Sequence, residues 1–133
     1  MISQKDKKKV YIFGNGGSAS DAQHFAAELV GRFEKERKGY PVIALNTDSS
    51  TLTAISNDYG FEFLFSRQIE AIGNAGDVAI GITTSGKSKN VINAIKTAKK
   101  KGLKCIAFTG NYTRLVSGFC DEIISVPALN TSR

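Results

Sequence analysis

The 133-residue sequence has no tryptophan, one histidine and two cysteines, and its uncharged stretches are short. Glycine, asparagine and serine interrupt the longest of these stretches, so none could cross a bilayer as a helix. The lysine-rich segment 1–9 has no apolar segment behind it, so we do not expect a secretory signal. These features together predict a cytoplasmic protein without a membrane partner.

The composition is typical of one globular domain. Hydrophobic residues make up 41% of the chain and charged residues 23%, and a chain of this length can enclose one core. We therefore expect residues 1–133 to form a single domain. Cys105 and Cys120 lie among apolar residues, and in a reducing compartment such thiols are expected to be free and buried.

The net charge of +6 raises the alternative of a nucleic-acid partner. The excess lysines and arginines lie in segments 5–9, 35–38 and 99–101. The last two are typical of helix ends, and cations in a last turn complement the helix dipole. Aromatic residues do not alternate with these clusters as a base-stacking surface would need. We expect a solvated basic surface and no nucleic-acid partner.

Strand-like and helix-like patterns alternate along the chain. Strands are expected at 9–13, 42–45, 77–82, 103–108 and 122–126, and helical segments at 19–33, 51–56, 61–72 and 88–101. Almost wholly apolar strands between helices predict an α/β fold: a doubly wound, five-stranded parallel sheet covered on both faces, a flavodoxin-like three-layer sandwich.

Two loops rich in glycine and hydroxyl side chains follow the first and third expected strands, at 14–18 and 83–88. In a 2-1-3-4-5 strand order these loops face each other across the switch point of the sheet. Glycines allow backbone N–H groups to approach an anion, although they are also common in plain tight turns. Neither loop is a dinucleotide fingerprint or a P-loop. We expect a small phosphorylated ligand among Ser18, Thr83, Ser85 and Ser88.

The single histidine, His24, lies four residues before Glu28, so both fall on one face of the helix that is expected to leave the glycine loop. Such a pair could bind a metal, act as an acid–base pair, or form an ordinary partly buried hydrogen bond. Two side chains do not complete a tetrahedral zinc site. Asn57 and Asp58 precede Tyr59 and Gly60, a composition that is typical of a turn.

Taken together, these segments resemble the phosphoheptose isomerases of the SIS (sugar isomerase) domain family. The motifs occur in the family's order and spacing from Lys9 onward, at 14–19 (Gly-Asn-Gly-Gly-Ser-Ala), 21–29 (Asp-Ala-Gln-His-Phe-Ala-Ala-Glu-Leu), 54–60, 65–68 and 81–88. The resemblance implies isomerisation of sedoheptulose 7-phosphate to D-glycero-D-manno-heptose 7-phosphate through an enediol(ate). That reaction feeds the synthesis of lipopolysaccharide precursors.

The resemblance also implies roles for individual residues. Substrate contacts are expected at Asn15, Gly16, Gly17, Ser18, Glu28, Asn57, Asp58, Thr83, Thr84, Ser85 and Ser88. Glu28 would be the catalytic base and would bind zinc together with His24. The family forms homotetramers, and we expect self-association through the apolar side chains of Phe61, Leu64 and Phe65.

Members of that family open with a long helical segment and continue into a C-terminal helix whose Gln and His complete the zinc site. We therefore expect the remaining zinc ligands beyond Arg133, and slow or undetectable turnover by residues 1–133 alone. The same loops would also suit a non-catalytic SIS domain, one that binds a phosphosugar or docks a partner in replication initiation.

Overall fold

The computed structural model describes residues 8–18 and 41–125. Within these residues, five parallel strands form one sheet in the order β2-β1-β3-β4-β5. The strands are β1 (Val10–Gly14), β2 (Val42–Ala44), β3 (Val78–Thr83), β4 (Lys104–Thr109) and β5 (Glu122–Ser125). The α/β fold with a parallel, doubly wound sheet is confirmed, and each predicted strand bound differs from the observed one by at most one residue.

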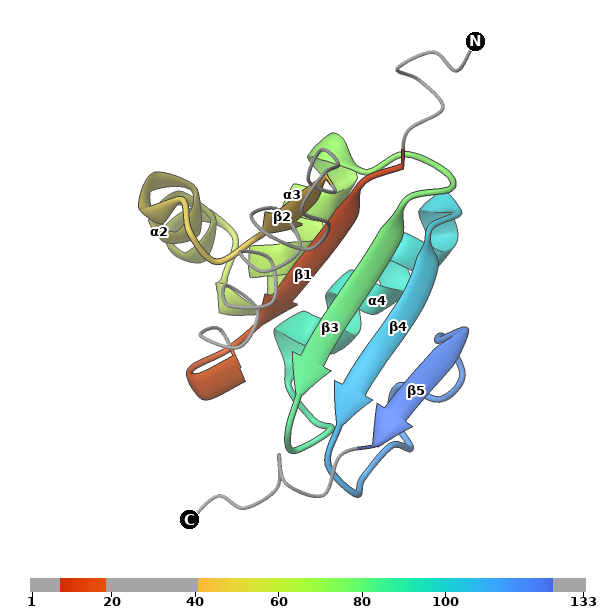
Figure 1. Cartoon of the computed structure of the whole chain (residues 1–133). Helices are drawn as coiled ribbons and strands as arrows, with labels where there is room; N and C mark the ends of the chain where they lie inside the picture. The colour runs from red at the N-terminus through yellow and green to blue at the C-terminus, as the bar shows by residue number, and fades with distance from the viewer. Residues whose placement is uncertain (1–7, 19–40, 126–133) are drawn as a thin grey trace, which may run out of the picture.

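Helical segments connect the strands: α2 (Ser49–Asp58), the 3₁₀ turn η2 (Phe61–Phe63), α3 (Leu64–Ile72) and α4 (Lys89–Lys101). Figure 1 shows α3 and α4 together behind the sheet. The helix expected at 19–33, which would cover the other face, lies outside the described residues. Within the described part of the chain, no helix has the length and apolarity needed to cross a membrane.

Helix α2 is longer than the short helical turn expected at 51–56. Asp48 caps it, since the Asp48 carboxylate accepts hydrogen bonds from Thr51 N at 3.3 Å and Thr51 Oγ1 at 2.9 Å. Such a cap satisfies backbone donors at a helix start. None of the residues of α2 is fully buried; Leu52 and Ile55 are partly buried against the core.

The expectation of a turn at Asn57 and Asp58 was wrong. Both residues belong to the last turn of α2, which ends at Tyr59, where the backbone N–H donates to Ile55 O. The helix that was expected at 61–72 is divided, because Phe61–Phe63 form a 3₁₀ turn before α3 begins.

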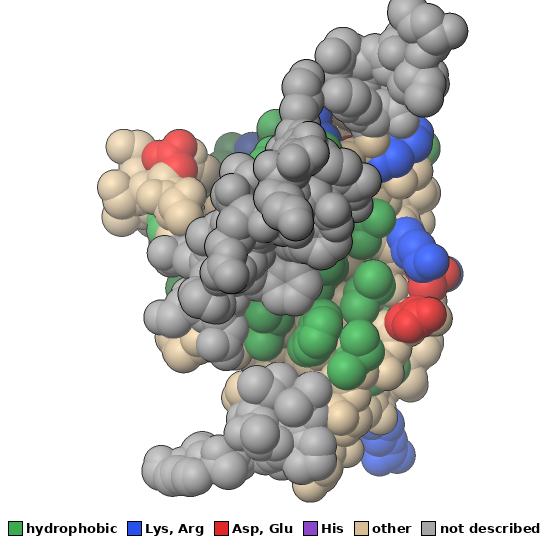
Figure 2. Space-filling view, in the orientation of Figure 1, with side chains coloured by type: hydrophobic (Ala, Val, Ile, Leu, Met, Phe, Trp, Pro, Cys, Tyr) green, Lys and Arg blue, Asp and Glu red, His purple; other side chains and the backbone are tan. Residues whose placement is uncertain are grey.

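The main core lies between the sheet and the α3–α4 layer. Phe13 of β1 and Phe65 of α3 are both fully buried, and their ring centroids are 5.3 Å apart. Ile12 points to the opposite face, because neighbouring strand residues alternate, and packs there with Ile80 and Ile82. Figure 2 shows apolar side chains on that opposite face.

The apolar residues expected to mediate self-association differ in exposure. Leu64 is 5% exposed and Phe65 is fully buried, whereas Phe61 is 58% exposed. The first two belong to the core, because they lie on the face of α3 that packs against the sheet, so only Phe61 remains as an apolar anchor. Both thiols are free, as expected, although Cys120 is only half-buried. Loss of water on burial raises the pKa of Cys105 to about 12 and that of Cys120 to about 11.

The amino-terminal end of the sheet is closed around the Asp77 carboxylate, whose residue is 3% exposed. This group accepts hydrogen bonds from Lys9 N at 3.0 Å, Asn74 N at 3.0 Å and the Tyr11 hydroxyl at 2.9 Å. Burial alone would raise the pKa of Asp77, but these hydrogen bonds outweigh it and lower the pKa below its usual value.

Candidate functional site

The glycine loop begins where β1 approaches β3 too closely for a side chain. A Cβ atom on Gly14 would lie 2.9 Å from Ile82 O and 2.7 Å from Ser18 Cβ. The chain then turns through Gly16 at φ 54°, and Ser18 N donates to Asn15 O at 2.8 Å. The loop is therefore a tight turn that is held against the carboxyl end of β3.

The loop after β3 is organised by the hydroxyl of Thr83, which is 1% exposed. Thr83 Oγ1 accepts from Gly86 N at 3.1 Å and from Ser88 N at 3.4 Å, and it lies 2.9 Å from Ser88 Oγ. Either of the two hydroxyls can be the donor in that contact, so the Ser88 hydroxyl has a proton for a ligand when Thr83 donates.

Other groups of this loop also remain available to a ligand. Ser85 is exposed, and its Oγ accepts from Lys87 N at 3.0 Å, which leaves the Ser85 proton free. Gly86, at φ 73°, passes under the carbonyl of Tyr112, where a side chain would collide with that oxygen. The contact fixes the loop against the segment that follows β4.

Helix α4 begins at this loop and presents its amino terminus to the same region. Ser88 is the N-cap residue, but its side chain makes no capping hydrogen bond, and the first turn contains no acidic residue. Lys99, Lys100 and Lys101 occupy the last turn, as the charge pattern predicted. The unpaired N–H groups and the helix dipole favour an anion at the Ser88 end.

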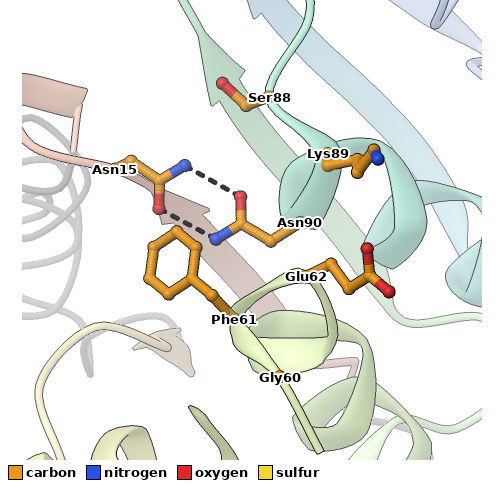
Figure 3. A pocket seen from close by; sticks show the side chains of 7 residues that line it. All are labelled: Asn15, Gly60, Phe61, Glu62, Ser88, Lys89 and Asn90. Carbon is orange, nitrogen blue, oxygen red and sulfur yellow. Dashed lines mark hydrogen bonds between the residues drawn. The ribbon is translucent and has the colours of Figure 1, made fainter.

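A pocket of about 470 Å³ joins the two loops. It is lined by Asn15, Gly60, Phe61, Glu62, Ser88, Lys89 and Asn90. In Figure 3, Asn15 enters from the glycine loop and Ser88 and Asn90 from the start of α4, while Phe61 and Glu62 come from the 3₁₀ turn. The prediction that the two loops face each other is confirmed.

The remaining predicted site residues are less closely grouped. Thr84 is half-buried, Gly16 and Gly17 are exposed, and Asn57 and Asp58 are exposed at the end of α2. Asn57 Nδ2 donates to Asp58 Oδ1 at 3.2 Å, and the chain reaches the pocket wall two residues later at Gly60. Their substrate contacts stay predictions. His24 and Glu28 lie outside the described residues.

The sequence analysis missed Asn90. This residue is 2% exposed, and its amide forms two hydrogen bonds with the amide of Asn15. Its neighbours Val91, Ala94 and Ile95 on α4 are buried. A polar residue on the buried face of an amphipathic helix was the signal that could have identified it.

No metal site is formed by the residues that the structure describes: they contain no group of three or more His, Cys, Asp or Glu side chains able to hold an ion.

The sequence matches the model of the SIS domain family over residues 1–110. It is 55% identical over 129 residues to a phosphoheptose isomerase from Nitratiruptor, covering 97% of this chain and 69% of that protein. It is 58% identical over 129 residues to the phosphoheptose isomerase of Aquifex aeolicus, covering 97% of this chain and 68% of that protein.

Solved structures agree with these relatives. A phosphoheptose isomerase from Francisella tularensis superposes with a TM-score of 0.83 at 38% identity, covering 92% of this chain and 66% of that one. GmhA, the phosphoheptose isomerase of Neisseria gonorrhoeae, gives a TM-score of 0.82 at 47% identity, covering 92% and 65%. The chain thus spans about two thirds of the length of the relatives it matches. It belongs to the SIS domain family and, within that family, to the phosphoheptose isomerases.

Proposed function

We propose that the protein isomerises sedoheptulose 7-phosphate to D-glycero-D-manno-heptose 7-phosphate, for the synthesis of heptose and lipopolysaccharide precursors in the cytoplasm. The observation that carries the proposal is the pocket between the two loops, in a chain that is more than half identical to phosphoheptose isomerases. The reaction moves hydrogen within one molecule and therefore needs no external oxidant or reductant.

The phosphate group of the substrate binds at the hydroxyl loop. Ser85 and Ser88 donate hydroxyl protons to phosphate oxygens, and the amino terminus of α4 adds backbone donors and the favourable end of its dipole. The sugar extends from there past Asn15 toward Asn57 and Asp58. Neutral donors suit this role, because they hold a dianion without releasing a proton to it.

Glu28 is the base of the reaction. Its carboxylate removes a proton from C1 of the ketose while O2 takes up a proton, which gives the enediol(ate). The O1 hydroxyl then loses its proton as the carbonyl forms at C1, and the proton held by Glu28 returns to C2 to give the aldose. This step belongs to residues outside the described part of the chain, so it rests on the family resemblance.

Zinc is the proposed metal. An imidazole and a carboxylate are donors that zinc prefers, and His24 and Glu28 would hold it with ligands from elsewhere. When bound, zinc would polarise the sugar oxygens. Loss of metal from a His24→Ala variant, measured by elemental analysis of the purified protein, would test the site independently of turnover. We further propose a homotetramer, as the resemblance implies.

The deciding experiment measures turnover of sedoheptulose 7-phosphate, with zinc added, by the protein together with the residues expected beyond Arg133, since little turnover is expected from residues 1–133 alone. The Glu28→Gln variant should lose about 10²–10⁴-fold in rate, the usual effect of removing a general base. Glu122→Gln is the matched control, because Glu122 is an exposed carboxylate at the start of β5, an edge strand. Equal rates in the wild type and Glu28→Gln would refute the base. Binding without turnover by the wild type would favour the non-catalytic module.

A further inference from the structure

Asn15 and Asn90 form a closed pair of amides across the pocket. Asn15 Nδ2 donates to Asn90 Oδ1 at 2.8 Å, and Asn90 Nδ2 donates to Asn15 Oδ1 at 3.0 Å. Figure 3 shows the two side chains pointing at each other, one from the glycine loop and one from α4. The partners are separated by 75 residues in the sequence.

Two hydrogen bonds between one pair of groups restrain more than a single one does. They fix the distance between the amides and also the relative orientation of their planes, so neither side chain can rotate without breaking both bonds. Asn90 is 2% exposed, and leaving its amide unpaired there would carry a desolvation cost. The pair is therefore strongly favoured in the folded protein.

The two partners differ in what they can still bind. Asn15 is only half-buried and lines the pocket. One amide hydrogen and one lone pair of Asn15 are used by Asn90, so its second hydrogen and second lone pair remain for a ligand. Asn90 thus determines which half of the Asn15 amide is available to the pocket.

We propose that Asn90 is a positioning residue, which holds the Asn15 amide ready for the sugar phosphate and couples the glycine loop to the start of α4. This inference rests on the proposed function, since it assumes that the substrate binds between these loops. Asn90 itself need not touch the substrate. Its effect on binding passes through Asn15.

The test is a double-mutant cycle on the dissociation constant of sedoheptulose 7-phosphate, measured by calorimetry. Asn90→Leu keeps a similar volume but removes both hydrogen bonds, and Asn15→Ala removes the contact residue. Each single variant should weaken binding about tenfold, because a misplaced contact group is costly even when it is not deleted. The double variant should be no weaker than Asn15→Ala alone.

The control is Lys101→Met, at the other end of α4. Lys101 Nζ also donates to a distant acceptor, Glu70 O at 2.7 Å, but neither residue lines the pocket. This variant should bind as the wild type does. The proposal would be overturned if the dissociation constant of the double variant rose by the product of the two single effects. It would also be overturned if Asn90→Leu bound sedoheptulose 7-phosphate as tightly as the wild type does.

Two further measurements keep the outcome clear. If Asn90→Leu does not fold, the smaller Asn90→Ser replaces it in the same cycle. If the wild type does not bind sedoheptulose 7-phosphate, the proposed function fails, and the coupling is judged instead from ¹⁵N relaxation. Lower order parameters at Gly16 and Gly17 in the Asn90 variant than in the wild type would support it, and unchanged values would overturn it.

Discussion

At the amino-terminal end of the sheet, the Asp77 carboxylate is enclosed by three donors of its own chain. At the carboxyl end, the Ser85 hydroxyl accepts from Lys87 N and keeps its own proton for a ligand. The amino-terminal end therefore contains a buried carboxylate whose hydrogen bonds are all made within the protein. The carboxyl end contains neutral donors and an uncapped helix terminus.

The difference shows how one sheet can separate stability from binding. A buried carboxylate with complete hydrogen bonding stabilises the fold but offers nothing to a ligand. Unpaired donors at the other end stabilise the fold less, and they are available to an incoming anion. Substitutions at the two ends should therefore affect different measurements.

The largest effect is expected from Asp77→Ala. This change removes the acceptor of the Lys9 and Asn74 N–H groups and one of the two acceptors of the Tyr11 hydroxyl, which also donates to Ile72 O at 3.0 Å. It should lower the free energy of unfolding by about 3 kcal/mol. Urea denaturation of the wild type and of Asp77→Ala measures this loss of unfolding free energy. The dissociation constant for sedoheptulose 7-phosphate should stay unchanged while the variant is folded; weaker binding would show that the two ends are not independent.

The converse result is expected at the carboxyl end. Ser85→Ala removes an exposed hydroxyl that is free to donate to phosphate, and should weaken binding by about 1–3 kcal/mol, the range for a hydrogen bond to a charged group. Its free energy of unfolding should change by less than about 1 kcal/mol. Ser117→Ala is the control, since the exposed Ser117 hydroxyl donates to Arg114 O in its own turn. A purely destabilising Ser85→Ala would contradict the comparison.

A smaller effect is expected from pH. The pKa of Asp77 is lower in the folded protein than in the unfolded chain, so its contribution to stability is present above about pH 4 and is lost as pH falls through the folded-state pKa. Asp77→Asn has no such titration. The difference in unfolding free energy between the wild type and Asp77→Asn should narrow as the pH falls from 7 through the folded-state pKa of Asp77, and urea denaturation at several pH values measures it. A constant difference would show that the charge of Asp77 is not what stabilises this end.

The sequence predicted the sheet and the facing loops because apolar strands and glycine-rich turns are local signals. Thr83 and Ser88 could be assigned to a phosphate site from their position after a strand. Their mutual hydrogen bond could not, because it depends on how the loop folds back at Gly86. The roles of His24 and Glu28 came from the family resemblance, since their spacing alone allowed several interpretations.

The missed features depend on contacts between distant segments. The sequence around Asn90 has a helical pattern, but nothing in it indicates the hydrogen bonds to Asn15, 75 residues earlier. Helical spacing grouped Phe61 with Leu64 and Phe65, yet only the last two reach the core, since the chain is still in a 3₁₀ turn at Phe61. Asn57 and Asp58 have turn-forming side chains, but the cap at Asp48 starts a helix that runs through them.

Helix α2, which has no fully buried residue, has a consequence for dynamics. Elements with little burial open locally at a smaller free-energy cost than the core, and their amide hydrogens exchange faster. Asn57 and Asp58 stand at the end of this helix, so a ligand that they contact would raise the free energy of local opening there more than in β3 or α4. Ligand binding in the pocket would then slow amide exchange in α2, although α2 does not itself form the pocket wall.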